Sequence, residues 1–364
     1  HAARRPRADV VKVEHPDGGD ETRAWGPPFH DGHTTYYLSV NRNKRSVALD
    51  LKSDSGRRAA RALATRADVV VENFRAGSLE RLGLGYEQVA ADNPGLVWCS
   101  ISGFGRGAGA ELPGYDFLVQ AMSGLMSITG PAGGEPTKVG VALVDVLTGL
   151  YAFGGVLAAL QERERTGRGQ RVEVSLLGSA LASLVNQASS FLCTGTPPRA
   201  MGNRHPSITP YETLATADRP LVVAVGNDGQ FARLCRVLGL DGAAADPRFA
   251  TNADRVANRE ELVPLLEGAL AARGAADWVA ALADAGVPCG LVNDVGEAFA
   301  LAERLGLAPV ADAGGVPQVA NPIGLPATPA SYRLAPPALG EHTAEVLRWL
   351  AAPPPGDPGP VRAP

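Results

Sequence analysis

The sequence predicts an α/β protein that contains an open parallel sheet and a second, smaller α/β domain. Three observations support this fold class. The length of 364 residues exceeds that of one compact domain. Short apolar segments alternate with helical patterns in the first half of the chain, as they do in parallel βαβ units. A stretch rich in Pro, Gly, Ser and Asn at 193–210 then precedes a further α/β pattern.

Five short strands are expected in the first half, because each segment is a short run with many β-branched or apolar residues: 8–14, 46–51, 67–74, 95–102 and 170–177. Helical patterns at 53–66 and 146–165 lie between them, and Thr166-Gly167-Arg168-Gly169 ends the second helix. Ligands of open α/β sheets bind outside the carboxyl ends of the strands. Functional residues are therefore expected directly after these segments.

The second half contains a strand pattern at 221–225 and amphipathic helices at 228–238, 259–272 and 275–285. Together these elements indicate the smaller α/β domain. The proline-rich segment 353–364 is expected to be a disordered tail.

Composition excludes several classes of protein. The 34 basic and 38 acidic residues include no basic stripe with interleaved aromatic residues, so a nucleic-acid partner is not expected. The four cysteines lie far apart, which favours reduced thiols and no metal site. The apolar run 141–160 contains Asp145 and several glycines, so it is interpreted as buried rather than membrane-spanning. The N-terminus lacks the apolar core of a signal peptide, and the expected compartment is the cytoplasm.

Asp145 is the most unusual residue, because it follows the apolar run 139–144 and precedes a long apolar helix. Aspartate at a helix N-cap stabilises the helix by about 0.5–2 kcal/mol, and capping alone would explain this residue about as well as catalysis does. A carboxylate at a helix start also stays ionised at neutral pH, as a nucleophile must. Both interpretations remain open from the residues alone.

Other candidates are weaker. His205 is a lone histidine in a loop, a context in which positioning is commoner than acid–base catalysis. The glycine-rich segment 103–109 fits neither dinucleotide nor P-loop spacing, and no G-x-S-x-G elbow is present. The residues by themselves therefore indicate an α/β enzyme with a candidate aspartate.

Eight short motifs follow one another along nearly the whole chain: 8–14, 43–46, 71–75, 113–117, 140–145, 165–170, 286–290 and 339–343. Each motif alone is weak, but the set in this order resembles the family III CoA-transferases, the family of formyl-CoA and carnitine CoA-transferases. The segments 202–208 and 226–228 look closest to the branch that includes succinate-hydroxymethylglutarate CoA-transferase.

The resemblance implies an interlocked homodimer, in which each chain has a Rossmann-like large domain and a small α/β domain. It places a CoA-binding large domain at 1–185, completed by 331–352, and a small domain at 206–305. Linkers are then expected at 186–205 and 306–330.

The resemblance also implies the chemistry. The aspartate that matches Asp145 attacks an acyl-CoA thioester to give a mixed anhydride, and the CoA thiolate returns to form an aspartyl-CoA thioester. A second carboxylic acid completes the exchange. Acyl-CoA and a carboxylic acid are thus the substrates, and no cofactor beyond coenzyme A is implied.

Matching positions give the binding residues. Leu49 and Lys52 would flank the adenine and ribose-phosphate end of CoA, and His15 stands where formyl-CoA transferases carry arginine. The nucleotide and pantetheine path would be lined by Asn73, Phe74, Arg75 and Arg81. Tyr115 and Asp116 would lie near the thioester. If they do not bind CoA, Lys52, Arg75 and Arg81 would be ordinary charged residues of the protein surface.

Substrate contacts are expected from the loop 202–205. The backbone amide of Gly202 or its neighbours would stabilise the oxyanion. Arg204 has the bidentate geometry that suits a dicarboxylate, and the role of His205 stays open. Succinyl-CoA is the expected donor, and Arg204→Ala is expected to raise the KM of the acceptor.

Two alternatives compete with the transferase. A related α-methylacyl-CoA racemase uses a histidine at the position of Tyr115, and tyrosine with an ordinary pKa near 10 is a poor base at neutral pH. The other alternative is a truncated, non-catalytic CoA-binding homologue, because family members normally carry a strand and a helix before the segment that matches Ala8.

Overall fold

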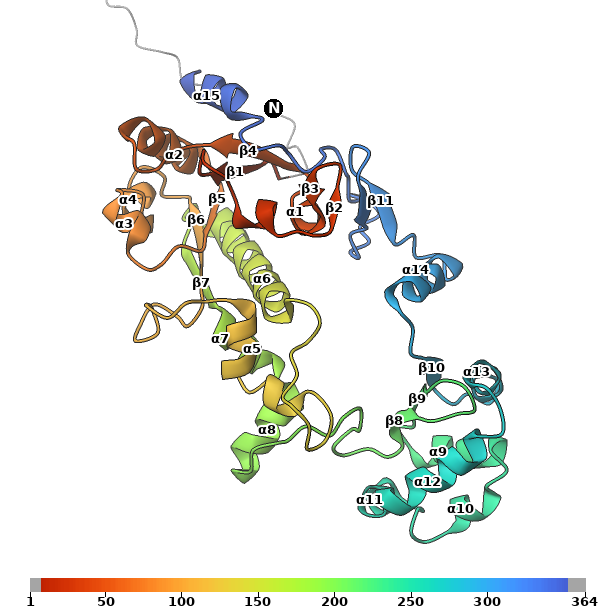
Figure 1. Cartoon of the computed structure of the whole chain (residues 1–364). Coiled ribbons are helices and arrows are strands. Elements are labelled where there is room, and N and C mark those ends of the chain that lie inside the picture. Colours follow the sequence, from red (N-terminus) through yellow and green to blue (C-terminus); the bar gives the residue numbers. More distant parts are fainter. Residues whose placement is uncertain (1–7, 353–364) are drawn as a thin grey trace, which may run out of the picture. The chain divides into compact units, whose positions relative to one another are not determined.

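The computed structural model describes residues 8–352 of the chain. The expected tail at 353–364 lies outside the described residues. The chain forms two compact units (Figure 1). The first comprises the described parts of 1–114, 146–179 and 299–364, and the second comprises 115–145 and 180–298.

Parallel strands form the centre of the first unit, as predicted. Strand β1 (Val10–Glu14) pairs with β4 (Lys44–Ala48), with Val10 opposite Lys44. A second parallel sheet has the order β5-β6-β7, made of β5 (Val69–Glu72), β6 (Val97–Ser102) and β7 (Arg171–Ser175). Two small antiparallel pairs accompany them, β2 (Phe29–His30) with β3 (His33–Thr34) and β11 (Val310–Asp312) with β12 (Pro317–Val319).

Three strands of the first unit end at least two residues earlier than the sequence predicts. Strand β5 ends at Glu72, whose carboxylate accepts a hydrogen bond from the amide of Phe74 at 2.9 Å. Strand β4 ends at Ala48, because the chain turns where the side chain of Asp50 accepts a hydrogen bond from the amide of Lys52 at 2.8 Å. Strand β7 ends at Ser175, whose hydroxyl accepts from the amide of Gly178 at 3.1 Å and so begins helix α7 (Leu176–Ser183). Hydrogen bonds from backbone amides to nearby side chains thus replace strand pairing at each of these ends.

Helices cover these strands. Helix α2 (Asp54–Arg66) begins as predicted, with Ser53 as its N-cap, and α15 (Thr343–Ala351) packs with it on β4 (Figure 1). Val346 of α15 lies in one buried cluster with Val47 and Leu49. The first unit also contains the short helices α1 (Thr35–Val40), α3 (Ser78–Arg81) and α4 (Tyr86–Ala90) and a 3-10 turn at Glu21–Ala24. A second 3-10 turn, Met126–Ile128, belongs to the second unit.

The motif 339–343 closes the free edge of β4. The backbone of Ser46 donates to His342 Nδ1 at 3.3 Å and accepts from the amide of His342 at 2.9 Å. The amide of Ala48 donates to Thr343 Oγ1 at 3.0 Å. Unpaired strand edges invite aggregation, so this segment protects the sheet.

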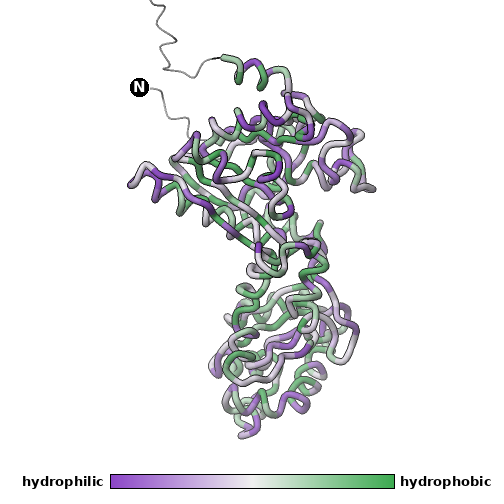
Figure 2. Tube along the Cα trace, turned by 90° about the vertical axis from the view of Figure 1, so that its left-hand side faces the viewer, coloured by the Kyte–Doolittle hydropathy of each residue, from purple (hydrophilic) through white to green (hydrophobic). Residues whose placement is uncertain are grey.

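The second unit contains an antiparallel sheet of order β10-β9-β8, made of β8 (Tyr211–Leu214), β9 (Leu221–Ala224) and β10 (Cys289–Leu291). The predicted helices appear as α9 (Asp228–Val237), α12 (Arg259–Leu270) and α13 (Ala275–Asp284), joined by the short α10 (Asp241–Ala245) and α11 (Asn252–Ala257). Their apolar faces bury one core that includes Phe231, Leu266 and Trp278. Along the trace coloured by hydropathy, hydrophobic and hydrophilic stretches alternate, as amphipathic elements require (Figure 2).

Both expected linker regions contain regular elements. The segment 186–205 begins within α8 (Val185–Thr194) and has no helix or strand after it. The segment 306–330 follows α14 (Val295–Arg304) and contains the β11–β12 hairpin.

Helix α6 (Leu143–Thr166) is the longest helix among residues 8–352. By length and composition it could cross a membrane, and α7 with α8, bent by 81°, meets the same criteria as a pair. These criteria alone do not place the chain in a membrane. Only 22% of the apolar window of α6 is buried, however, so the expectation that the run 141–160 is buried was wrong for the single chain. Residues 8–352 contain no group of three or more His, Cys, Asp or Glu side chains that could hold a metal ion.

Candidate active site at the start of helix α6

Asp145 lies in the first turn of α6 and not at its cap. The sequence predicted a helix from 146, but the helix begins at Leu143, so Asp145 is its third residue. Its side chain is exposed. The interpretation that Asp145 is only an N-cap therefore loses its basis.

Asp116 performs the capping instead. Its Oδ1 accepts hydrogen bonds from the amide of Val144 at 2.8 Å and from that of Asp145 at 3.2 Å. These amides belong to the first turn, whose N–H groups have no partner within a helix. A carboxylate supplied by helix α5 (Asp116–Met122) thus satisfies the turn that carries Asp145.

The capping carboxylate is itself held by a buried side chain. Gln120, with no exposed surface, donates from Nε2 to Asp116 Oδ2 at 2.7 Å. Its Oε1 accepts from the amide of Val139 at 2.9 Å. Sequence reasoning did not single out Gln120, because a lone glutamine within a helical pattern carries no motif.

The pKa of the Asp145 carboxyl is raised above its ordinary value, first by desolvation and then by the like charge of Asp116. The exposure of the side chain leaves room for a reacting group, while the surrounding protein still removes part of the carboxyl's hydration. A more basic carboxylate is a better nucleophile, and the positive end of the helix dipole favours its ionised form.

Tyr115 directly precedes α5. Its side chain is 60% exposed, and its carbonyl accepts from the amide of Val119 at 3.0 Å. The amide of Asp145 donates to Asp116, and Tyr115 precedes Asp116 in the chain, so the structure brings these three predicted residues together within the second unit.

The residues expected to bind CoA follow the parallel strands of the first unit at their carboxyl ends. His15 follows β1 and Leu49 follows β4, and the amide of Leu49 donates to the carbonyl of Glu14 at 2.9 Å. Asn73, Phe74 and Arg75 follow β5. Ligands of open α/β sheets bind at the carboxyl ends of the strands, so these residues are at the expected place.

Accessibility differs among these residues. Leu49 is only 7% exposed, so it contributes its backbone and an apolar floor. The ring of Phe74 is 52% exposed, and Lys52, Arg75 and Arg81 are exposed cations. His15 is exposed, and its Nδ1 accepts from the amide of Asp17 at 3.1 Å. Exposed cations suit phosphates, and an exposed aromatic ring suits a nucleotide base.

The loop 202–205 lies in the second unit beside a cavity of about 500 Å³, lined by Ile128, Thr129, Gly130, Pro131, Gly202 and Asn203. The amide of Gly202 donates to the carbonyl of Gly130 at 2.9 Å. Stabilisation of an oxyanion by this amide therefore requires that hydrogen bond to open.

His205 and Arg204 both have partners within the second unit. His205 Nδ1 accepts from the amide of Ser207 at 3.1 Å, and its ring lies 5.2 Å from that of Tyr211. Arg204 contacts Glu260 at 2.6 Å and Glu212 at 3.3 Å. Burial raises the pKa of Glu212 despite two arginines nearby, so Arg204 already compensates a buried acid.

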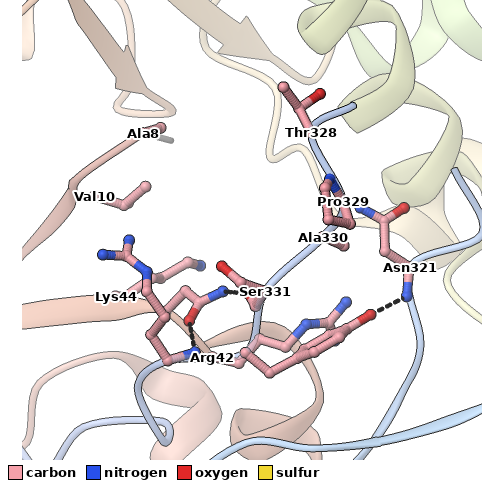
Figure 3. A pocket seen from close by; sticks show the side chains of 12 residues that line it. Ala8, Val10, Arg42, Lys44, Asn321, Thr328, Pro329, Ala330 and Ser331 are labelled. Atoms are coloured by element: carbon pink, nitrogen blue, oxygen red, sulfur yellow. Dashed lines mark hydrogen bonds between the residues drawn. The ribbon is translucent and has the colours of Figure 1, made fainter. Parts of the chain in front are cut away.

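A separate cavity of about 340 Å³ lies in the first unit (Figure 3). Ala8, Val10 and Lys44 line it from the amino ends of β1 and β4, and Thr328 and Pro329 line it from the C-terminal segment. This cavity therefore lies at the amino ends of these strands, whereas the residues expected to bind CoA follow the carboxyl ends.

The comparisons with known proteins bear on this geometry. A family model described as CoA-transferase family III matches residues 8–343. The chain belongs to this family. The resemblance expected from the eight motifs is thereby confirmed, and the enzyme is a CoA-transferase.

Two curated relatives of this CoA-transferase are named for succinate or succinyl-CoA together with glutarate. The chain is 46% identical over 355 residues to "Succinate--glutarate CoA-transferase" of Agrobacterium fabrum, covering 94% of this chain and 89% of the relative. It is 40% identical over 348 residues to "Succinyl-CoA:glutarate CoA-transferase" of Mus musculus, covering 94% and 80%.

Solved structures agree with the fold of the CoA-transferase. A CAIB/BAIF family protein from Brucella suis matches with a TM-score of 0.84 at 44% identity, covering 94% of this chain and 92% of that chain. The protein Rv3272 from Mycobacterium tuberculosis matches with a TM-score of 0.83 at 30% identity, covering 93% and 91%. The predicted α/β fold of the family is therefore confirmed.

The contacts of Arg204 in this CoA-transferase lead to a test of its expected role. Arg204→Ala should lower the free energy of unfolding by about 1–3 kcal/mol, because Glu212 loses a partner for a buried carboxylate. Urea denaturation measures this loss, and Arg236→Ala, a control on α9, should change little. A higher acceptor KM with unchanged stability would instead support contact between Arg204 and the substrate.

Proposed function

We propose that this CoA-transferase moves CoA from succinyl-CoA to a second dicarboxylic acid, through covalent intermediates on Asp145. The observation that carries the proposal is an exposed carboxylate with a raised pKa in the first turn of α6, held there by Asp116. The names of the relatives, which include succinate–glutarate and succinyl-CoA:mesaconate CoA-transferases, support the substrate class.

The first half of the reaction transfers CoA to the enzyme. A carboxylate oxygen of Asp145 attacks the thioester carbonyl, the C–S bond breaks, and CoA thiolate leaves a mixed anhydride behind. The thiolate then attacks the Asp145 carbonyl of the anhydride. The donor leaves as a free carboxylate, and an aspartyl-CoA thioester remains.

The second half reverses these steps with another acid. The acceptor carboxylate attacks the aspartyl thioester, which releases the thiolate and forms a new anhydride. The thiolate attacks the acceptor's carbonyl, so the new acyl-CoA forms and Asp145 regains its carboxylate. The free energy of thioester hydrolysis is conserved in the new acyl-CoA, provided that water does not hydrolyse either intermediate.

The residues around the strands of the first unit would bind CoA. Phe74 offers an aromatic face for the adenine, and Lys52, Arg75 and Arg81 offer charge for the phosphates. In the second unit, Tyr115 and the exposed carboxylate of Asp145 are the groups proposed to contact the thioester. The chain would act as an interlocked homodimer. Leu150 and Phe153 on α6 support this proposal, because exposed apolar side chains mark protein interfaces. A mass in solution equal to that of a single chain would contradict it.

Mass spectrometry of the protein mixed with succinyl-CoA tests the proposal. We expect a CoA adduct on the peptide that contains Asp145, and we expect Asp145→Ala to lack it. Trapping with hydroxylamine should convert the thioester to a hydroxamate at the same residue. An adduct that persists in Asp145→Ala would overturn the assignment, and α-proton exchange of a branched acyl-CoA without any adduct would favour the racemase chemistry.

A further inference from the structure

Gln120 is a buried polar side chain to which the proposed mechanism gives no role. It lies on α5, one helical turn after Asp116, and it has no exposed surface. Buried amides are costly unless they are hydrogen-bonded. Gln120 meets this requirement with Asp116 on its own helix and with Val139 and Val141 on the segment before α6.

The first contact joins Gln120 to the capping carboxylate. Its Nε2 donates to Asp116 Oδ2 at 2.7 Å, as residues at i and i+4 of a helix can. The other oxygen, Oδ1, is then the one that accepts from Val144 and Asp145. Each oxygen of Asp116 thus has its own partners, which fixes the rotation of the carboxylate.

The second set of contacts joins Gln120 to the segment that leads into α6. Its Oε1 accepts from the amide of Val139 at 2.9 Å, and Nε2 lies 3.4 Å from the carbonyl of Val141. This segment ends at Leu143, where α6 begins. One side chain therefore restrains both the approach to the helix and the carboxylate that caps it.

At neutral pH, an amide satisfies all of these groups, whereas an ionised or an aliphatic side chain does not. A carboxylate at this position could accept from Val139 but would repel Asp116, and an aliphatic side chain would leave both groups unpaired. The amide is also neutral, so it orients Asp116 without cancelling its charge. The other charged groups of this cluster are Asp145 and Lys138, whose ammonium lies 3.3 Å from the carbonyl of Val139.

We propose that Gln120 is a positioning residue for CoA transfer, which holds the Asp116 carboxylate against the first turn of α6 and thereby orients Asp145. The inference rests on the proposed role of Asp145 as nucleophile. Displacement of a reacting atom by about 1 Å can slow a reaction about 100-fold, so the effect should appear in the chemical step and not in substrate binding.

The test compares Gln120→Leu with the wild type and with Gln318→Leu. Gln318 is a second buried glutamine, on β12 and 6% exposed, and it serves as the control for the loss of a buried amide. We expect Gln120→Leu to slow formation of the Asp145 adduct and to lower kcat by about 10- to 100-fold, with KM for succinyl-CoA little changed. Gln318→Leu should keep the wild-type rate, even if both variants melt at lower temperature.

Gln120→Glu separates positioning from folding, because its effect depends on pH. When protonated, the glutamic acid can donate to Asp116 and still accept from Val139, so adduct formation should approach the wild-type rate. When ionised, it repels Asp116 and the rate should fall. The rate ratio of variant to wild type is therefore expected to rise as pH is lowered, at pH values where both proteins stay folded by circular dichroism.

The outcomes distinguish this inference from the proposed function. If the wild type forms no adduct on Asp145, the nucleophile assignment fails first. If the wild type forms the adduct while the folded fraction of Gln120→Leu forms it at the same rate, the positioning role alone is overturned. A pH-independent ratio for Gln120→Glu would likewise overturn it.

Discussion

Asp145→Asn is expected to reduce CoA transfer by at least about a thousandfold while the protein remains folded. The amide has nearly the same shape as the carboxylate and keeps the first turn of α6 intact, because Asp116 and not Asp145 caps that turn. It cannot attack the thioester. Steady-state transfer from succinyl-CoA measures the loss, and circular dichroism controls for folding. Residual activity within tenfold of the wild type would rule out Asp145 as the nucleophile.

The raised pKa of Asp145 gives this prediction a pH dependence. Only the ionised carboxylate attacks, so activity should fall on the acid side at a higher pH than for an ordinary aspartate, whose pKa is near 4. A shift that raises the pKa in the folded state also makes stability fall as pH rises between the unfolded and folded pKa values. Asp145→Asn should therefore melt at a higher temperature than the wild type at neutral pH, with the difference disappearing in acid. A lower melting temperature at neutral pH would contradict this.

Gly169→Ala is expected to destabilise the first unit by about 3 kcal/mol or more. A Cβ atom at this position would lie 1.9 Å from the carbonyl oxygen of Leu96, which is backbone and cannot move aside as a side chain could. The amide of Gly169 also donates to Pro94 at 2.9 Å, and Gln170 accepts from Trp98 at 3.0 Å, so the pairing of β6 with β7 begins here. Urea denaturation and the yield of soluble protein measure the effect.

Gly268→Ala is the matched control for this substitution. Gly268 lies within α12, is exposed, and has nothing within 4 Å of a Cβ atom. Alanine should stabilise this helix by about 0.5–1 kcal/mol. Equal stability of the two variants would show that the contact with Leu96 is not what requires glycine at 169.

Local patterns were sufficient to predict the five parallel strands of the first unit, one strand of the second unit and five of the longer helices. The β-branched runs correspond to β5 and β6, and the amphipathic patterns correspond to α9, α12 and α13 within two residues of their expected bounds. The family was also predictable, because eight motifs in one order are specific even though each is short. These features depend on residues near one another in the chain, so the sequence displays them directly.

The arrangement around Asp145 depends on contacts that no local pattern encodes. The sequence marked Asp145 as unusual but could not choose between capping and catalysis, because the capping carboxylate comes from Asp116, 29 residues earlier in the chain. Arg204 looked free to bind a dicarboxylate, yet Glu260 lies beside it 56 residues later. Gln120 carried no motif and became meaningful only through its contacts with Asp116 and Val139. The sequence by itself determined the family, the parallel strands of the first unit and the candidate nucleophile. The tertiary structure decided how that nucleophile is held, because hydrogen-bond partners distant in the chain are chosen by folding and not by spacing.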